Sequence, residues 1–249
     1  SPDLTLNQKD HQQNSGGIAV DNLMTFDGAT LFAIEESPIE AGLIWTGSND
    51  GQIQLSRNGG KNWQNVTQNI PNLPPWSTVS SIHPSKYKKG TAYIAIDLHQ
   101  MGDFGTYLYK TSDYGMHWES IVGNVPQSVH SFAHVLKEDP KKEGMLYLGL
   151  DNSLLISIDD GVHWMTLKNN LPPAPIYWLE VQENFDDLVV STYGRGYYIL
   201  DDLSALRQFN PDLKVSPQVF GPRKSYRLNN KESIKTDGYS FNSGRNPAY

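Results

Sequence analysis

Two acidic side chains near the middle of the chain are the first candidates for chemistry. Asp97 and Asp103 lie in one long loop, IDLHQMGDFG. Glycoside cleavage needs a pair of carboxyl groups, one to protonate the leaving oxygen and one to act as nucleophile or base. Because both residues belong to the same loop, we favour a structural role for them over a catalytic one.

Aromatic, imidazole and cationic side chains in the neighbouring loops are candidates for ligand binding. Ring faces stack on apolar patches of a sugar or a peptide, and charged groups orient it. In the alternative that we favour, the tryptophans close the top of the core and the histidines cap loops. The candidate ligand-binding residues are Trp76, His99, His130, Trp178, Tyr193 and Arg195.

Sialidase chemistry would need a cluster of arginines for the sugar carboxylate and a tyrosine nucleophile with an acidic partner. The sequence offers few arginines, and Arg195 is the one expected near a ligand. Its place in STYGRGYY favours a structural role, in which the guanidinium ties the last hairpin to a neighbour.

Three octets identify the elements that must position these side chains. SRNGGKNW, TSDYGMHW and SIDDGVHW share the pattern Ser/Thr-x-Asp/Asn-x-Gly-x-x-Trp. The pattern predicts a tight turn that needs glycine at positive φ and is stabilised by a polar side chain, followed by a buried tryptophan. Its residues are Ser56, Asn58, Gly60 and Trp63, then Thr111, Asp113, Gly115 and Trp118, then Ser157, Asp159, Gly161 and Trp164.

The sequence around each octet also repeats. Each is preceded by two strand-like runs joined as a hairpin, with a further strand candidate upstream, and is followed by a short fourth run. The octets begin at Ser56, Thr111 and Ser157, at spacings typical of one four-stranded propeller blade. A fourth unit, from IYWLEVQ to GRGYYILDD, has no octet, and DDLSAL after it predicts a short helix that Asp202 caps.

The octets resemble the Asp-boxes, or bacterial neuraminidase repeats, of sialidase-like and sortilin-like β-propellers. STYGRGYYILDDLSALRQ resembles the end of the propeller in large exported bacterial proteins labelled glycosyl-hydrolase-like or sortilin-like, and the likeness extends from Leu4 to Gln208. Asn58 departs from the acidic position of the box, which puts a metal role there in doubt. The resemblance implies a secreted, periplasmic or cell-surface bacterial protein.

Composition excludes several classes of protein. The net charge is −7 and no basic block is present, which argues against a nucleic-acid partner. Cysteine is absent, so this chain forms no disulfide scaffold and no thiolate metal site. No apolar run approaches the roughly 20 residues that a membrane span requires. We expect neither a cofactor nor a metal.

We therefore expect an all-β protein, with residues 1–208 forming about four blades of a larger, incomplete propeller and 209–249 a tail that leads toward a following domain. The first strand and last hairpin should each face another blade, from the same protein or a second chain, through Phe32, Ile34, Val190, Tyr198 and Leu200. The expected function is non-catalytic binding of a peptide, a glycan or a partner protein. The alternative is a sialidase-like or xyloglucanase-like glycoside hydrolase with part of its active site outside this chain.

Overall fold

Four antiparallel sheets form the folded part of the chain. The computed structural model describes residues 2–7, 29–209 and 219–224. Each sheet is built from consecutive strands in chain order, and we call the sheets blades 1 to 4. Blade 1 contains β1 (Leu31–Glu36), β2 (Ile44–Ser48), β3 (Ile53–Ser56) and β4 (Gln64–Asn65); blade 2 contains β5 (Thr78–Pro84), β6 (Ala92–Asp97), β7 (Tyr107–Thr111) and β8 (Glu119–Ser120); blade 3 contains β9 (Ala133–Glu138), β10 (Leu146–Leu150), β11 (Leu154–Ser157) and β12 (Met165–Thr166); blade 4 contains β13 (Ile176–Gln182), β14 (Asp187–Thr192) and β15 (Gly196–Leu200).

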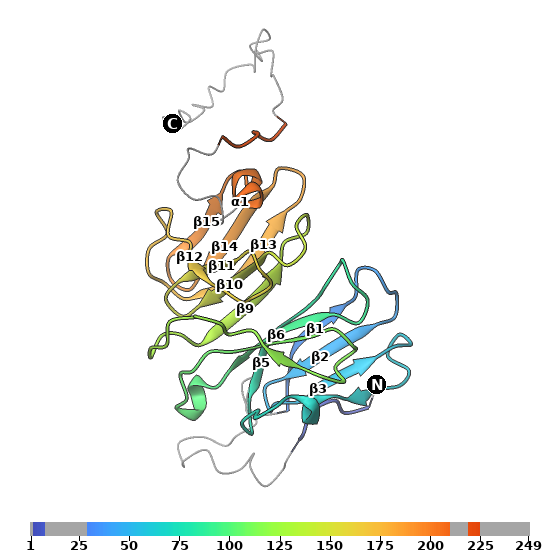
Figure 1. Cartoon of the computed structure of the whole chain (residues 1–249). Helices are drawn as coiled ribbons and strands as arrows, with labels where there is room; N and C mark the ends of the chain where they lie inside the picture. Colours follow the sequence, from blue (N-terminus) through green and yellow to red (C-terminus); the bar gives the residue numbers. More distant parts are fainter. Residues whose placement is uncertain (1, 8–28, 210–218, 225–249) are drawn as a thin grey trace, which may run out of the picture.

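The blades follow one another in chain order, from blue to orange (Figure 1). The first strand of each blade is the innermost, because β1 lies against β5, β5 against β9, and β9 against β13. The β2–β3, β6–β7 and β14–β15 loops therefore emerge at the opposite end of the sheets from the turns between first and second strands. This arrangement confirms the expected all-β propeller blades.

Apolar clusters fill the spaces between successive blades. Trp45 of blade 1 and Trp118 of blade 2 pack edge to face in the first cluster, with ring centroids 6.0 Å apart. The blades lie so close that two strand glycines are required: a Cβ at Gly47 would lie 2.4 Å from Val79, and one at Gly149 would lie 2.7 Å from the Ile176 carbonyl. Side-chain burial between sheets is thus the main stabilising term of the fold.

The octets form the same turn three times. In each, the hydroxyl of the first residue accepts a hydrogen bond from the glycine four residues on: Gly60 N to Ser56 at 2.8 Å, Gly115 N to Thr111 at 2.9 Å and Gly161 N to Ser157 at 2.9 Å. The Asn58 side chain accepts from the Asn62 amide at 2.9 Å, as Asp113 and Asp159 do from the equivalent residues. The amide oxygen therefore replaces the carboxylate without changing the turn.

The three octet tryptophans differ in burial. Trp118 and Trp164 are buried against the preceding blade, whereas Trp63 is only partly buried. Blade 1 has no preceding blade among the described residues, and the expectation of a buried ring is wrong for Trp63. The reason is that an octet tryptophan is covered by the preceding blade and not by the sheet to which it belongs.

Both end blades expose apolar side chains on their outer faces. Phe32 and Ile34 on β1 are 51% and 65% exposed, as expected. On β15 the exposed residues are Tyr197 and Ile199, at 78% and 62%, while Val190 on β14 is buried. The predicted outward orientation of Val190, Tyr198 and Leu200 is therefore wrong: Tyr198 and Leu200 pack toward blade 3.

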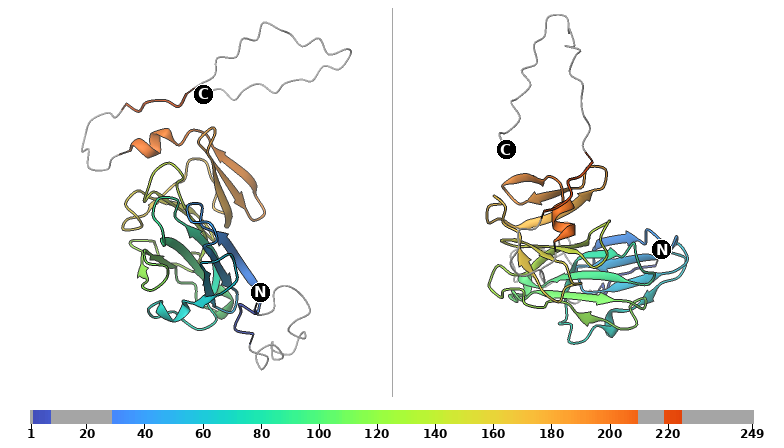
Figure 2. Two further views of the ribbon diagram at one scale, coloured as in Figure 1. Left: turned by 90° about the vertical axis from the view of Figure 1, so that its right-hand side faces the viewer. Right: turned by 45° about the horizontal axis from the view of Figure 1, so that its top comes forward.

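The short helix α1 (Ser204–Gln208) follows β15, where the sequence predicted a helix. Figure 2 shows it beside blade 4 and apart from the blue first blade. Asp202 accepts a hydrogen bond from the Ser204 amide at 3.0 Å, and Arg207 pairs with Asp139 at 2.9 Å. Most of the predicted tail, 209–249, lies outside the described residues. Within the residues that the structure describes, no helix has the length and apolar content for crossing a bilayer.

Candidate functional site

A cavity of about 330 Å³ lies where the inner strands of all four blades come together, and we call it the central cleft. Its walls include Phe32 of β1, Ser80 of β5, His134 of β9 and Trp178 of β13. Asp97 at the end of β6, Asn49 of the β2–β3 loop and Gln100 of the β6–β7 loop contribute further polar side chains. Its volume falls within the roughly 300–1,000 Å³ of small-molecule pockets.

Asp97 and His99 form a pair in the wall of the cleft. The His99 Nδ1 lies 2.7 Å from both carboxylate oxygens of Asp97, and the backbone amide of His99 donates to the same carboxylate at 2.9 Å. Asp97 is buried at the end of β6, and a one-turn 3₁₀ segment (His99–Met101) follows it. These contacts fix the orientation of the His99 imidazole and use part of the hydrogen-bonding capacity of the Asp97 carboxylate.

A continuous row of rings runs along the cleft from blade 2 to blade 4. His99 stacks on Phe132 with centroids 4.6 Å apart, and Phe132 meets His134 edge to face at 5.2 Å. His134 stacks on Tyr177 at 4.4 Å, and Tyr177 lies 5.6 Å from Tyr193. His134 and Tyr177 lie on the inner strands β9 and β13, and Phe132 directly precedes β9. His99 and Tyr193 come from the β6–β7 and β14–β15 loops, so the row joins three blades.

One of the two histidines in this row, His134, is held neutral. Burial lowers the pKa of His134, although Asp97 and Asp151 oppose the shift. Asp151 lies 3.5 Å from the His134 Nε2 and 2.9 Å from the His130 Nδ1. Burial likewise raises the pKa of the Tyr177 hydroxyl, so the stacked His134 and Tyr177 rings are both uncharged near neutral pH.

Trp178 contributes an exposed indole ring to the wall of the cleft. Its ring is 44% exposed, and the Lys137 ammonium lies 4.5 Å from its centroid. Lys137 also pairs with Glu180 at 3.2 Å and lies 4.0 Å from Glu35 of blade 1. The cation therefore connects the inner strands of blades 1, 3 and 4 and steadies the indole.

Several predicted residues lie outside the central cleft. Trp76, at a φ of +62°, borders a separate cavity of about 510 Å³ beside the N-terminal segment. Asp103 accepts hydrogen bonds from the Gly105 amide and the Tyr107 hydroxyl. His130 is exposed and does not line the cleft; its Nδ1 pairs with Asp151, which also lies near His134.

Arg195 is exposed in the β14–β15 turn, and its guanidinium makes no hydrogen bond or ion pair to a described residue. The expected tie from this arginine to a neighbouring hairpin is therefore not present in the described part of the chain. Among the candidate ligand-binding residues, the structure brings His99 and Trp178 into the cleft wall and Tyr193 to the end of the ring row.

Sequence reasoning missed Phe32, Phe132 and His134. Phe132 and His134 are two residues apart at the start of a strand, so their side chains share one face. That alternation, together with the position of the strand as first in its unit, was the signal that could have identified them. Phe32, which the sequence predicts on an outer face, also lines the cleft because β1 is an inner strand.

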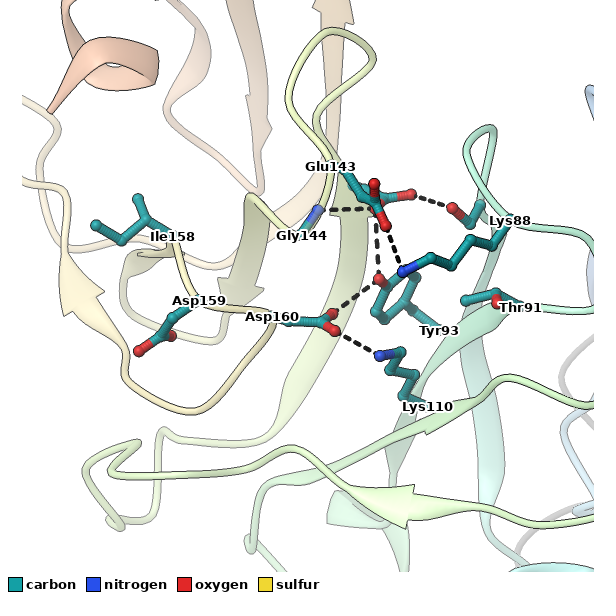
Figure 3. A pocket seen from close by; sticks show the side chains of 11 residues that line it. Lys88, Thr91, Tyr93, Lys110, Glu143, Gly144, Ile158, Asp159 and Asp160 are labelled. Atoms are coloured by element: carbon teal, nitrogen blue, oxygen red, sulfur yellow. Dashed lines mark hydrogen bonds and ion pairs between the residues drawn. The ribbon is translucent and has the colours of Figure 1, made fainter. Parts of the chain in front are cut away.

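A third pocket, of about 280 Å³, lies between blades 2 and 3 at the octet end of the sheets (Figure 3). Its charged groups pair with one another: Lys88 with Glu143 at 2.6 Å, and Lys110 with Asp160. The Tyr93 hydroxyl donates to Asp160 at 2.8 Å. These pairs join blade 2 to blade 3, so the charged groups of this pocket form an inter-blade contact.

Comparison with solved structures identifies β-propellers. A glycoside hydrolase family 74 enzyme from Niastella koreensis aligns with a TM-score of 0.56 and 14% identity, over 72% of this chain and 29% of that one. The family 74 xyloglucanase from Xanthomonas campestris gives 0.51 and 17%, over 64% and 25%. YCF48 bound to a D1 peptide gives 0.46 and 13%, over 68% and 53%.

Each of these alignments spans less than two thirds of the other protein. No protein-family model and no curated protein matches the sequence. At these identities the likeness concerns the fold and not the ligand. With three four-stranded sheets and a three-stranded one in its described residues, the chain has the β-propeller fold, in the form of a partial propeller.

Proposed function

We propose that this chain is a carbohydrate-binding propeller that holds a glycan in the central cleft without cleaving it. The observation that carries the proposal is the ring row beside the Asp97–His99 pair. Exposed faces of Trp178 and Phe32 offer apolar surface to sugar rings, and the carboxylate and imidazole groups offer hydrogen bonds to hydroxyls. Neutral polar side chains such as Asn49, Thr78 and Gln100 add further donors and acceptors.

The same geometry supports binding over hydrolysis. Among the described residues that line the cleft, Asp97 is the one carboxylate, and it is already engaged by His99. Asp103 bonds within its own loop. The two-carboxyl arrangement of glycoside hydrolases is thus not assembled by this pair.

A glycan array tests the proposal, with the full chain and the Trp178→Ala variant. We expect one class of glycan to bind. The variant should lose roughly tenfold in affinity, about 1.4 kcal/mol of binding free energy, because it lacks the exposed ring on which a sugar stacks. His117→Ala is the control, since His117 is exposed on an octet turn at the other end of the sheets.

Two outcomes would contradict the proposal. Binding to a peptide library in place of glycans, with the same loss in Trp178→Ala, would assign the cleft to peptides. Hydrolysis of chromogenic glycosides or xyloglucan that Asp97→Asn abolishes would make the chain part of a glycoside hydrolase.

A further inference from the structure

Blade 4 differs from the other three in having no fourth strand among the described residues. In blades 1 to 3 the octet turn leads into a two-residue strand that pairs with the third strand. In blade 4 the chain leaves β15 and enters α1. The outer edge of β15 is therefore unpaired within the described chain.

The outer strand makes the same backbone contact in each complete blade. An amide three residues after the tryptophan donates to the carbonyl three residues before the end of the third strand: Val66 to Ile53, Ile121 to Leu108 and Leu167 to Leu154, at 2.8–3.0 Å. The equivalent residue of β15 is Tyr197. Backbone N–H and C=O groups point to the same edge of a strand at every second residue. The N–H and C=O groups of Tyr197 and Ile199 therefore point to the free edge of β15.

The tryptophan that precedes the outer strand also has a repeated environment. Trp118 packs with Val66 and Ile70 of blade 1, in one apolar cluster. Trp164 packs in the same way with Ile121 and Val125 of blade 2. The residues at the same distances after the blade 3 tryptophan are Leu167 and Leu171, which would receive a tryptophan from blade 4.

An apolar cavity of about 240 Å³ lies at that equivalent position between blades 3 and 4. Leu167 and Leu171 line one side of it, and Tyr198 and Leu200 of β15 line the other. Its volume is below the usual range for small-molecule pockets and suits a single large side chain.

An asparagine supports the same equivalence. Asn69 donates to the Gly115 carbonyl at 2.7 Å, and Asn124 accepts from the Trp164 amide at 2.6 Å, so each binds the octet of the following blade. Asn170 holds this position in blade 3 and lines the cavity. Its side chain has no hydrogen-bond partner among the described residues.

We propose that the β15 edge and this cavity bind an extended segment of a partner polypeptide, which adds to blade 4 as its fourth strand. The segment would carry tryptophan followed three residues later by valine, isoleucine or leucine, as all three outer strands of this chain do. Main-chain hydrogen bonds to Tyr197 and Ile199 provide affinity, and the indole in the cavity provides specificity.

The probe is a synthetic peptide of sequence VHWMTLKN, which repeats residues 162–169, titrated into the full chain. We expect saturable binding, reduced roughly tenfold or more when the peptide tryptophan is replaced by alanine. Ile199→Pro should abolish binding because it removes an edge donor. Ile199→Ala is the matched comparison at the same position, because it keeps the backbone amide and shortens only the side chain; it should therefore bind much more peptide than Ile199→Pro.

Amide hydrogen exchange of the unmutated chain, measured with and without the peptide, tests the proposal even if the Ile199→Pro variant does not fold. The peptide should slow exchange at the Tyr197 and Ile199 amides. Absence of saturable binding, equal binding of the two peptides, or protection at the central cleft in place of β15 would each overturn the proposal.

Discussion

The His134 ring of blade 3 lies flat against the Tyr177 ring of blade 4, with centroids 4.4 Å apart and planes inclined by 21°. This stack joins two inner strands at the central cleft, and the His99–Phe132 stack continues the row into blade 2. The wall of the cleft is thus an inter-blade structure, so its shape depends on how successive blades pack.

The octet tryptophans should differ in their contribution to stability. We expect Trp164→Ala to lower the free energy of unfolding by about 3–5 kcal/mol, because the ring is buried in the cluster between blades 2 and 3. Trp63→Ala should cost clearly less, since that ring is only partly buried. Urea denaturation of the two variants measures the difference, and equal losses would contradict the idea that each ring packs on the preceding blade.

Acid should weaken the fold partly through His83 on β5. Burial, with the nearby Lys137 cation, lowers the pKa of His83 to about 3. As the pH falls below about 6.5, His83 takes up a proton in the unfolded chain but stays neutral in the folded chain. The free energy of unfolding is therefore highest above pH 6.5 and declines as the pH falls toward 3.

His83→Gln removes that contribution. From pH 7 to pH 5 we expect the variant to lose about 1–2 kcal/mol less stability than the native chain. Urea midpoints at both pH values provide the measurement. Parallel losses in the two proteins would show that His83 titrates normally in the fold.

The exposed outer faces of the end blades should promote association. Replacing Ile34 and Tyr197 with lysine places charges on two apolar faces, which we expect to reduce self-association of the full chain and sharpen its thermal transition. The control carries lysine at Met116 and Val162, which are exposed on octet turns. Sedimentation across a tenfold concentration range detects the change. A native chain that stays monomeric and melts in one sharp transition would contradict this prediction.

The sequence predicted the blades well because their signals are local. The octet turn is specified by hydrogen bonds within eight residues, such as those from the Gly161 amide to Ser157 and from the His163 amide to Asp159. The central cleft was predicted only in part. Which loop residues reach it depends on backbone conformations such as the positive φ of Trp76 and on bonds within the Asp103 loop, neither of which periodicity reveals.

The last hairpin shows a second limit. In GYYIL nearly every side chain is apolar, so alternation does not reveal which residues face inward. The turn around Gly194 and Gly196, both at a φ of +80°, fixes the register that pairs Val190 with Tyr198. A one-residue difference in phase was enough to reverse the predicted faces of β15.

The histidine imidazole signals provide the most direct test of glycan binding in the central cleft. A glycan identified on the array is titrated into the full chain while ring resonances are followed by NMR. His99 and His134 line the cleft, and His117 and His163 lie on octet turns at the other end of the sheets. The account predicts saturable shifts for the first pair and none for the second; shifts confined to the octet pair, or no saturable shift at His99 and His134, would contradict it.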